Sequence, residues 1–305
     1  MSPAAAQRRT MTSRLRSHLA ERPITWFFVL SYALSWLVWT PYVLSRNGIG
    51  VLPIEFPVIG GTTQLLGVLP GAYVGPLVSA FLLTALIGGR PGLRRWFGRV
   101  ARWRVHWSWY VGVLLGVPAA LTITSLPIMG HWQVPAADVL VVFAVGMVFQ
   151  LFTTGLAEEP GWRDFALPLL QPEYGPLRGT LLLGPLWGLW HLPLFFTEWG
   201  GWPVFSAIEV LEFCGLATAI SVVMTWVFNR TGESLPIAAL LHIGVNNYFS
   251  TTWSEIFPGG DHATVTRITL IASTIAAVVT IVATRGKLGY APPRSAPQHQ
   301  DPVSA

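Results

Sequence analysis

Residues 138–163 read DVLVVFAVGMVFQLFTTGLAEEPGWR. After its first residue this stretch is uncharged and mostly apolar, and about 20 such residues are enough to cross a bilayer as a helix. Two adjacent carboxylates and an arginine then follow within six positions, as Glu158, Glu159 and Arg163. Because charge beside hydrocarbon is costly and usually functional, the stretch predicts a transmembrane helix with a polar site at its end.

The composition of the whole chain is that of a membrane protein. The 305 residues are 52% hydrophobic and 11% charged. Apolar runs of transmembrane length lie at 24–45, 67–88, 107–128, 138–158, 177–197, 205–228, 234–250 and 265–284. The sequence therefore predicts an all-α fold, a polytopic transmembrane helical bundle of about eight spans. A soluble domain would leave the long uncharged runs unexplained.

We expect one continuous bundle without internal repeats. Its expected parts are a basic cytoplasmic N-terminal segment (1–23), transmembrane helices 1–3 (24–137), a core with the polar motifs (138–250), a loop with the last transmembrane helix (251–289) and a disordered tail (290–305). Residues 1–20 are also expected to be disordered.

Arginine supplies nearly all of the positive charge, with Lys287 the single lysine and a net charge of +5. The arginines cluster at the N-terminus and in residues 90–104, so the positive-inside rule predicts that both termini are cytoplasmic. This pattern indicates membrane topology rather than a nucleic-acid partner. The arginine-rich, lysine-poor composition favours a bacterial cell membrane. The single cysteine, Cys214, excludes an intramolecular disulfide.

Two further polar motifs follow the acidic one, WGLWH at 187–191 and HIGVN at 242–246. The turn signal QPEYGP at 171–176 predicts an antiparallel helical hairpin. Glu158 and His191 lie about 15 and 17 residues from its centre, hence at similar depth at about 1.5 Å per residue. Residues 162–170 are expected to project toward the cytoplasm.

The third motif is predicted at the same depth as the other two. His242 comes about 12 Å into a helix that begins near Ser234, and Asn246 follows on the same face. All three motifs are therefore expected in one layer near the cytoplasmic side. Glu209 and Glu212 are predicted nearer the outer side, outside this layer.

The spacing of the first motif predicts different roles for its two carboxylates. Glu159 and Arg163 are four residues apart and can pair, which leaves Glu158 free. A free carboxylate in a low-dielectric cleft can act as a general base. Pro160 is expected to kink the helix at this point. Singly, a structural ion pair, a core histidine or an asparagine bonded to a neighbouring helix would explain each residue, but their matched depth favours a functional site.

The ordered set Glu-Glu-x-x-x-Arg, aromatic-x-x-x-His and His-x-x-x-Asn resembles the CPBP family of intramembrane proteases. This family includes type II CAAX prenyl endopeptidases and bacteriocin-processing or immunity proteins. The resemblance covers about residues 138–250 and implies an endopeptidase with a membrane-associated peptide or protein substrate. It implies a water-activating carboxylate, Glu158, a supporting pair, Glu159 with Arg163, a water-binding histidine, His191, and an oxyanion-stabilising pair, His242 with Asn246.

Two positions depart from the family pattern. Trp187 stands where phenylalanine is common, a conservative aromatic change, and Asp164 stands where glycine is common, which puts an extra acid near Arg163. Two other functions stay open. A catalytically silent immunity or scaffold protein could keep the fold, and a transporter would be favoured by an inverted repeat.

The resemblance leaves the need for a metal open, because family members are described both as metalloproteases and as metal-independent glutamate proteases. Glu158, His191 and His242 could hold Zn²⁺ with water in an open position. Asparagine is a poor zinc ligand, and its amide is better suited to binding an oxyanion. The donor set therefore favours the metal-independent version without excluding zinc.

Overall fold

The computed structural model describes residue 14 and residues 16–292, and within them helices form without any β-strand. The predicted all-α class is therefore confirmed. The disorder expected at residues 1–13, 15 and 293–305 lies outside the described residues. Residues 16–20 are helical, so the expectation of disorder is wrong for that part of the N-terminal segment.

Seven helical stretches within the described residues are long and apolar enough to cross a membrane: Pro23–Leu44, Gln64–Val100, Trp107–Met129, Val139–Tyr174, Pro176–Phe196, Ala207–Arg230 and His262–Thr284. The eighth expected span corresponds to α14 (Leu235–Thr251), which has 17 residues. Most of α14 is buried among the other helices. The chain is therefore an integral membrane protein, and α14 lies inside its helical bundle.

Several spans are built from consecutive helical elements. The first half of the chain contains α2 (Pro23–Leu44), α3 (Gln64–Gly67), α4 (Leu69–Ala72), η1 (Tyr73–Leu77), α5 (Val78–Leu83), η2 (Thr84–Gly88), α6 (Gly89–Val100), α7 (Trp107–Leu114) and α8 (Gly116–Met129). The second half contains α9 (Val139–Gln150), η3 (Leu151–Gly155), α10 (Leu156–Gly161), η4 (Trp162–Ala166), α11 (Leu167–Tyr174), α12 (Pro176–Trp190), η5 (Leu192–Phe196), η6 (Glu198–Gly200), α13 (Ala207–Arg230), α14, α15 (Trp253–Ile256) and α16 (His262–Thr284).

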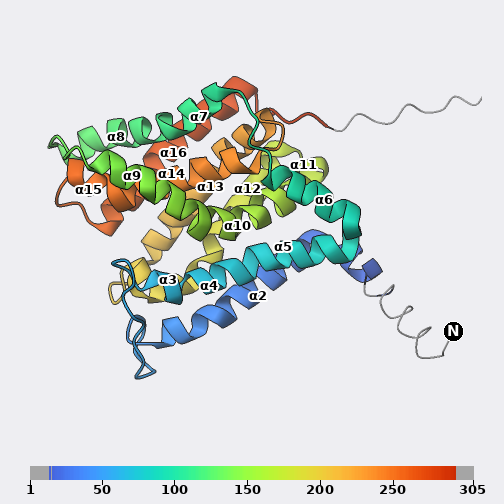
Figure 1. Ribbon diagram of the computed structural model, residues 1–305, viewed down its shortest axis with the longest axis horizontal. Helices are drawn as coiled ribbons and strands as arrows, with labels where there is room; N and C mark the ends of the chain where they lie inside the picture. The colour runs from blue at the N-terminus through green and yellow to red at the C-terminus, as the bar shows by residue number, and fades with distance from the viewer. Residues whose placement is uncertain (1–13, 15, 293–305) are drawn as a thin grey trace, which may run out of the picture.

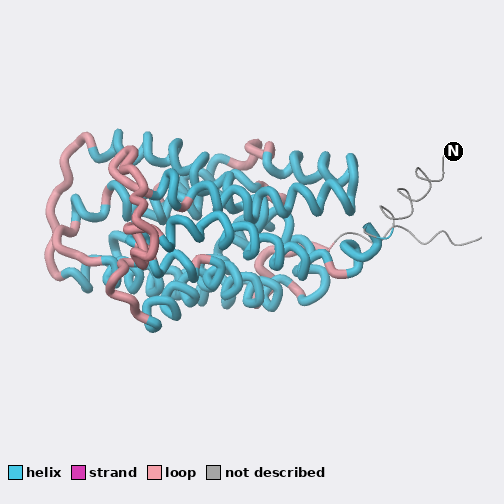
Figure 2. The backbone as a smooth tube through the Cα atoms, turned by 90° about the horizontal axis from the view of Figure 1, so that it is seen from below, coloured by secondary structure: helices cyan, strands magenta, loops and turns pink. Residues whose placement is uncertain are grey.

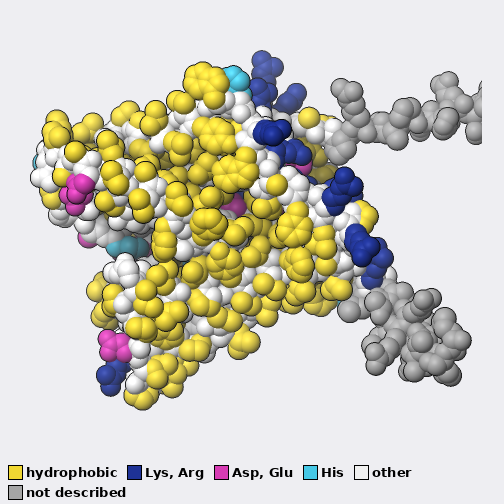
Figure 3. Space-filling view, viewed as in Figure 1, with side chains coloured by type: hydrophobic (Ala, Val, Ile, Leu, Met, Phe, Trp, Pro, Cys, Tyr) yellow, Lys and Arg dark blue, Asp and Glu magenta, His cyan; other side chains and the backbone are white. Residues whose placement is uncertain are grey.

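The helices run mostly along one axis, and many of the loops gather at one end of it (Figure 2). In Figure 1, α2 and α3–α5 lie side by side beneath α10, and α12, α13, α14 and α16 form the other part of the bundle. Apolar side chains cover the face seen in Figure 3, while Lys and Arg gather at the end where α6 lies. We call this the arginine-rich end. The distribution is the one expected of a protein surrounded by lipid along its sides.

Glycines set two features that position the polar motifs. Gly89, with a φ of +58°, turns the chain between η2 and α6, a conformation that favours glycine. Gly161 ends α10 against η1, and a Cβ atom added there would lie 2.5 Å from Cβ of Pro76. Small residues at helix contacts permit such a close approach in membranes. The helix with the two glutamates is thus fixed tightly against η1.

Two five-residue π-helical turns, η3 and η4, flank α10. The chain stays helical through Pro160, and the irregularity expected there takes the form of these turns. Such turns are frequent at functional sites because they redirect side chains. Residues 162–167 are buried, because α2 and α12 cover them: the ring of Trp162 lies 5.2 Å from that of Phe27 and 5.6 Å from that of Trp190.

Candidate active site

The two adjacent carboxylates of α10 lie in different surroundings. Glu159 is completely buried, and its Oε1 lies 2.8 Å from Nδ1 of His242 on α14. Its Oε2 lies 3.5 Å from Nε of Arg163, one helical turn further on. Glu159 therefore contacts the guanidinium predicted from the i, i+4 spacing and also a histidine from a distant motif, which links the first and third motifs directly.

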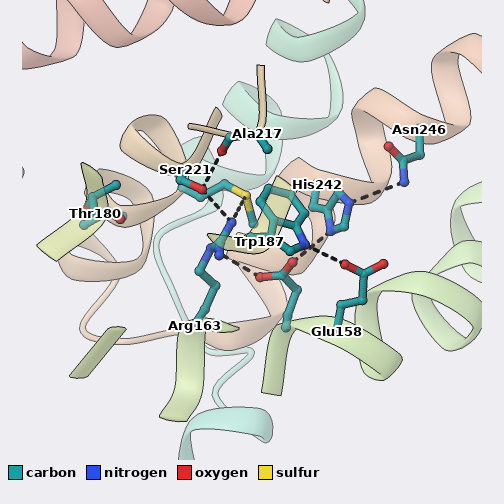
Figure 4. Close-up of polar contacts among 11 residues, drawn as sticks. Glu158, Arg163, Thr180, Trp187, Ala217, Ser221, His242 and Asn246 are labelled. Carbon is teal, nitrogen blue, oxygen red and sulfur yellow. Dashed lines mark hydrogen bonds and ion pairs between the residues drawn. The ribbon is translucent and has the colours of Figure 1, made fainter. Parts of the chain in front are cut away.

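Glu158 is also buried but retains 6% of its surface. Its Oε2 accepts a hydrogen bond of 2.8 Å from the indole N–H of Trp187 on α12. In Figure 4 the other carboxylate oxygen points away from that indole. Glu158 therefore has an oxygen available to bind water, whereas the oxygens of Glu159 face two cationic or donor groups.

His242 and Asn246 share one face of α14, as their spacing predicts. Nε2 of the imidazole lies 3.4 Å from Nδ2 of the amide. Because Nδ1 of His242 donates to the Glu159 carboxylate, the proton on that nitrogen is fixed and the second nitrogen faces Asn246. When His242 is protonated, the imidazole and the amide present two N–H donors side by side.

Trp187, in the second motif, contacts residues of both the first and the third motif. We call the polar side chains of the three motifs, together with Trp187, the cluster. The ring of Trp187 lies under the guanidinium of Arg163, with Cζ 4.6 Å from the ring centroid, and meets the ring of His242 edge-on at 4.9 Å and 89°. As a conservative aromatic change, Trp187 was expected to contribute only its ring, and the role of its N–H group was not predicted. The available signal was that a buried tryptophan needs a hydrogen-bond acceptor, and Glu158 provides it.

His191 caps the C-terminus of α12 and is buried. Its Nδ1 lies 3.0 Å from the carbonyl oxygen of Trp187, so this nitrogen is the donor and Nε2 keeps its lone pair. The ring stacks on Trp199, with 5.5 Å between centroids and 11° between planes. His191 joins the cluster through Trp187, whose ring lies 6.2 Å away.

Arg163 is completely buried. Its Nε lies near Glu159. Its Nη2 contacts Oγ of Ser221 at 3.1 Å and Sδ of Met224 at 3.2 Å, both on α13. These two α13 residues were not predicted, because their sequence surroundings are an ordinary apolar span. They hold the guanidinium in place against the ring of Trp187 (Figure 4).

Asp164 turns away from Arg163 and forms an ion pair with Arg99 of α6. The extra acid therefore pairs with Arg99, and Arg163 keeps its contact with Glu159. Arg99 also lies 3.4 Å from Glu233, just before α14. Through Arg99, the buried Asp164 thus connects the arginine-rich end to the helical stretch that carries the two glutamates.

Glu209 and Glu212 belong to another part of the bundle. Glu212 lies 3.1 Å from Nε of Arg267, and Glu209 lies 3.9 Å from His262. Both partners are on α16, and neither glutamate contacts the cluster through a described side chain. Their placement agrees with the expectation that they lie outside the layer of the three motifs.

The arrangement of donors bears on a metal site. Among the described residues, no group of three or more His, Cys, Asp or Glu side chains is placed to hold a metal ion. Oε2 of Glu158 accepts from Trp187 and Nδ1 of His242 donates to Glu159, which leaves the second donor atom of each side chain outside these two bonds. Because Glu158, His191 and His242 are not grouped to hold a metal as arranged here, no step below uses one.

Comparison with known proteins identifies the segment that carries the cluster. The CAAX prenyl protease 2 of Methanococcus maripaludis is 27% identical to this chain over 139 residues, which are 45% of this chain and 49% of that protein. The chain thus matches about half the length of this curated relative. Residues 140–248 also match the family model of type II CAAX prenyl endopeptidases, described as Rce1-like. This matched segment contains Glu158, Arg163, His191 and Asn246, so the resemblance to CPBP-family proteases predicted from the three motifs is confirmed for it.

Proposed function

We propose that this cluster is the active site of an intramembrane endopeptidase that cleaves a membrane-associated peptide or protein. The observation that carries the proposal is the asymmetry of the two carboxylates: Glu159 contacts both His242 and Arg163, while Glu158 accepts from a neutral N–H and keeps an exposed fraction of 6%. A structural ion pair would explain Glu159 but not a second buried carboxylate without a cation beside it.

The proposed reaction uses Glu158 as the general base. Its carboxylate takes a proton from a water molecule, and the resulting hydroxide attacks the peptide carbonyl carbon. The carbonyl oxygen becomes an oxyanion that accepts hydrogen bonds from Asn246 and from protonated His242. The C–N bond then breaks, and Glu158 returns its proton to the leaving amine. Glu159 stabilises the charged imidazole, and Nε2 of His191 is available to bind the attacking water.

We place the reaction near the cytoplasmic face, which we take to be the arginine-rich end. Asp164, bonded to Arg99, follows Glu159 by five residues, or about 8 Å along the helix. The positive-inside rule assigns the arginine-rich end to the cytoplasm. The cluster would then lie in the membrane but within reach of cytoplasmic water.

The test compares membrane-fraction proteomes from cells that produce the wild-type protein, Glu158→Gln or Glu209→Gln. Glu209 is a suitable control because it lies in a span but contacts α16 rather than the cluster. We expect Glu158→Gln alone to remove the cleaved termini, with unchanged thermal unfolding. Identical proteomes for these three strains and for a fourth strain without the protein would instead support a catalytically silent scaffold or immunity protein.

A further inference from the structure

The indole of Trp187 bonds to the one carboxylate of the site that lacks a cationic partner. Its Nε1 lies 2.8 Å from Oε2 of Glu158, and both side chains are nearly inaccessible, at 4% and 6% exposed. A neutral donor does not form an ion pair with the carboxylate. It therefore directs the carboxylate without removing its ability to accept a proton.

The same residue fixes a second group of the proposed reaction. The backbone carbonyl of Trp187 accepts the Nδ1 proton of His191 at 3.0 Å. This bond selects the tautomer in which Nε2 is an acceptor. The indole N–H and the carbonyl of one residue thus orient the carboxylate and the histidine that are both proposed to contact the attacking water.

Trp187 itself is held rigidly. The guanidinium of Arg163 lies 4.6 Å from its ring centroid and His242 meets its edge at 4.9 Å. The next residue, Gly188, packs against α13, where an added Cβ would lie 2.8 Å from Cα of Cys214. A rotation of the indole would have to displace a buried charge, a histidine or the contact between α12 and α13.

We infer that Trp187 is a positioning residue that aims Glu158 and His191 at a shared water molecule. Its indole holds Oε2 of Glu158, which leaves Oε1 for the water, and its carbonyl keeps Nε2 of His191 free as an acceptor. The inference rests on the proposed function. It also explains what a tryptophan adds over a phenylalanine at this position, because phenylalanine keeps the ring contacts but lacks the N–H.

The experiment compares Trp187→Phe with Trp253→Phe on the purified full-length chain, using a substrate found by the proteomic comparison. Trp253 is a matched control because it is 3% exposed and donates a 2.9 Å indole hydrogen bond to Ser125, outside the cluster. We expect similar losses of thermal stability in the two variants. Only Trp187→Phe should lower kcat, by about 10- to 100-fold with KM nearly unchanged, because it removes a hydrogen bond to a charged acceptor.

An independent readout is the indole ¹H–¹⁵N spectrum. The resonance missing from Trp187→Phe is assigned to Trp187, and it should move in Glu158→Gln but not in Glu209→Gln. If Glu158→Gln abolishes cleavage but the resonance does not move, or if both tryptophan variants have equal kcat, the inference about Trp187 is wrong. If Glu158→Gln cleaves normally, the proposed function fails instead, so the two failures are distinguishable.

Discussion

Oε1 of Glu159 lies 2.8 Å from Nδ1 of His242, a contact between residues 83 positions apart in the sequence. Its other oxygen lies 3.5 Å from the guanidinium of Arg163. One buried carboxylate therefore orients an imidazole and neutralises an arginine. In serine proteases a buried acid likewise holds a histidine in one tautomer and stabilises its charged form.

Replacing Glu159 by glutamine should damage both activity and stability. The amide carries no charge to stabilise protonated His242, and loss of the acid in the serine-protease triad lowers kcat by about 10⁴. It also leaves Arg163 buried without its carboxylate, which costs about 3 to 5 kcal/mol. Cleavage assays and thermal unfolding of Glu159→Gln would measure the two effects. Glu212→Gln is the control, and equal behaviour of both variants would contradict the role of Glu159.

Arg163→Ala should lower the yield of folded protein more than it lowers the activity per folded molecule. The change leaves Glu159 without its cation and removes the contacts to Ser221 and Met224. Arg163→Lys keeps the charge but cannot reproduce the planar contact with the Trp187 ring, so we expect an intermediate yield. Size-exclusion profiles of detergent extracts measure this series. Alanine and lysine variants that fold as well as the wild type would show that the pair is dispensable.

Two adjacent asparagines offer a comparison between chemistry and packing. Asn246 faces His242, whereas Asn247 is completely buried and donates to the carbonyl oxygen of Phe143 at 2.8 Å. Asn246→Ala should slow turnover by about 10² to 10³ with KM largely kept, because its hydrogen bond belongs to the transition state. Asn247→Ala should mainly lower the melting temperature. The reverse pattern in steady-state kinetics and thermal unfolding would reject this division.

The spans and the three motifs could be predicted because hydropathy and helical spacing are local properties of the sequence. The Glu159–Arg163 and His242–Asn246 contacts follow directly from the i, i+4 rule. The Trp187–Glu158 bond and the Asp164–Arg99 pair could not be predicted, since each joins elements whose relative rotation is set by packing. The π-helical turns beside Pro160 were missed for a similar reason: a proline indicates an irregularity but not which backbone form relieves it.

The proposed orientation can be tested by cysteine labelling in a Cys214→Ser background, which removes the native thiol. Single cysteines at Arg94 and at Glu255 report on the two ends, because the first lies on α6 and the second on α15. A membrane-impermeant maleimide should label only the position at Glu255 in intact cells and both positions after permeabilisation. Labelling of position 94 alone in intact cells would place the arginine-rich end outside and would move the site to the opposite face.

Removing metal should leave cleavage intact. Among the described residues no three His, Cys, Asp or Glu side chains are grouped to hold a metal ion, whereas catalytic zinc usually takes three protein ligands and a bound water. We therefore expect purified protein to keep full activity after exhaustive chelation and to contain no stoichiometric metal by mass spectrometry. Activity that is lost on chelation and restored by zinc would contradict the metal-independent mechanism. His191→Gln separates the two versions further: loss of a ligand would remove metal from the protein, whereas loss of a water-binding group would reduce turnover without changing its metal content.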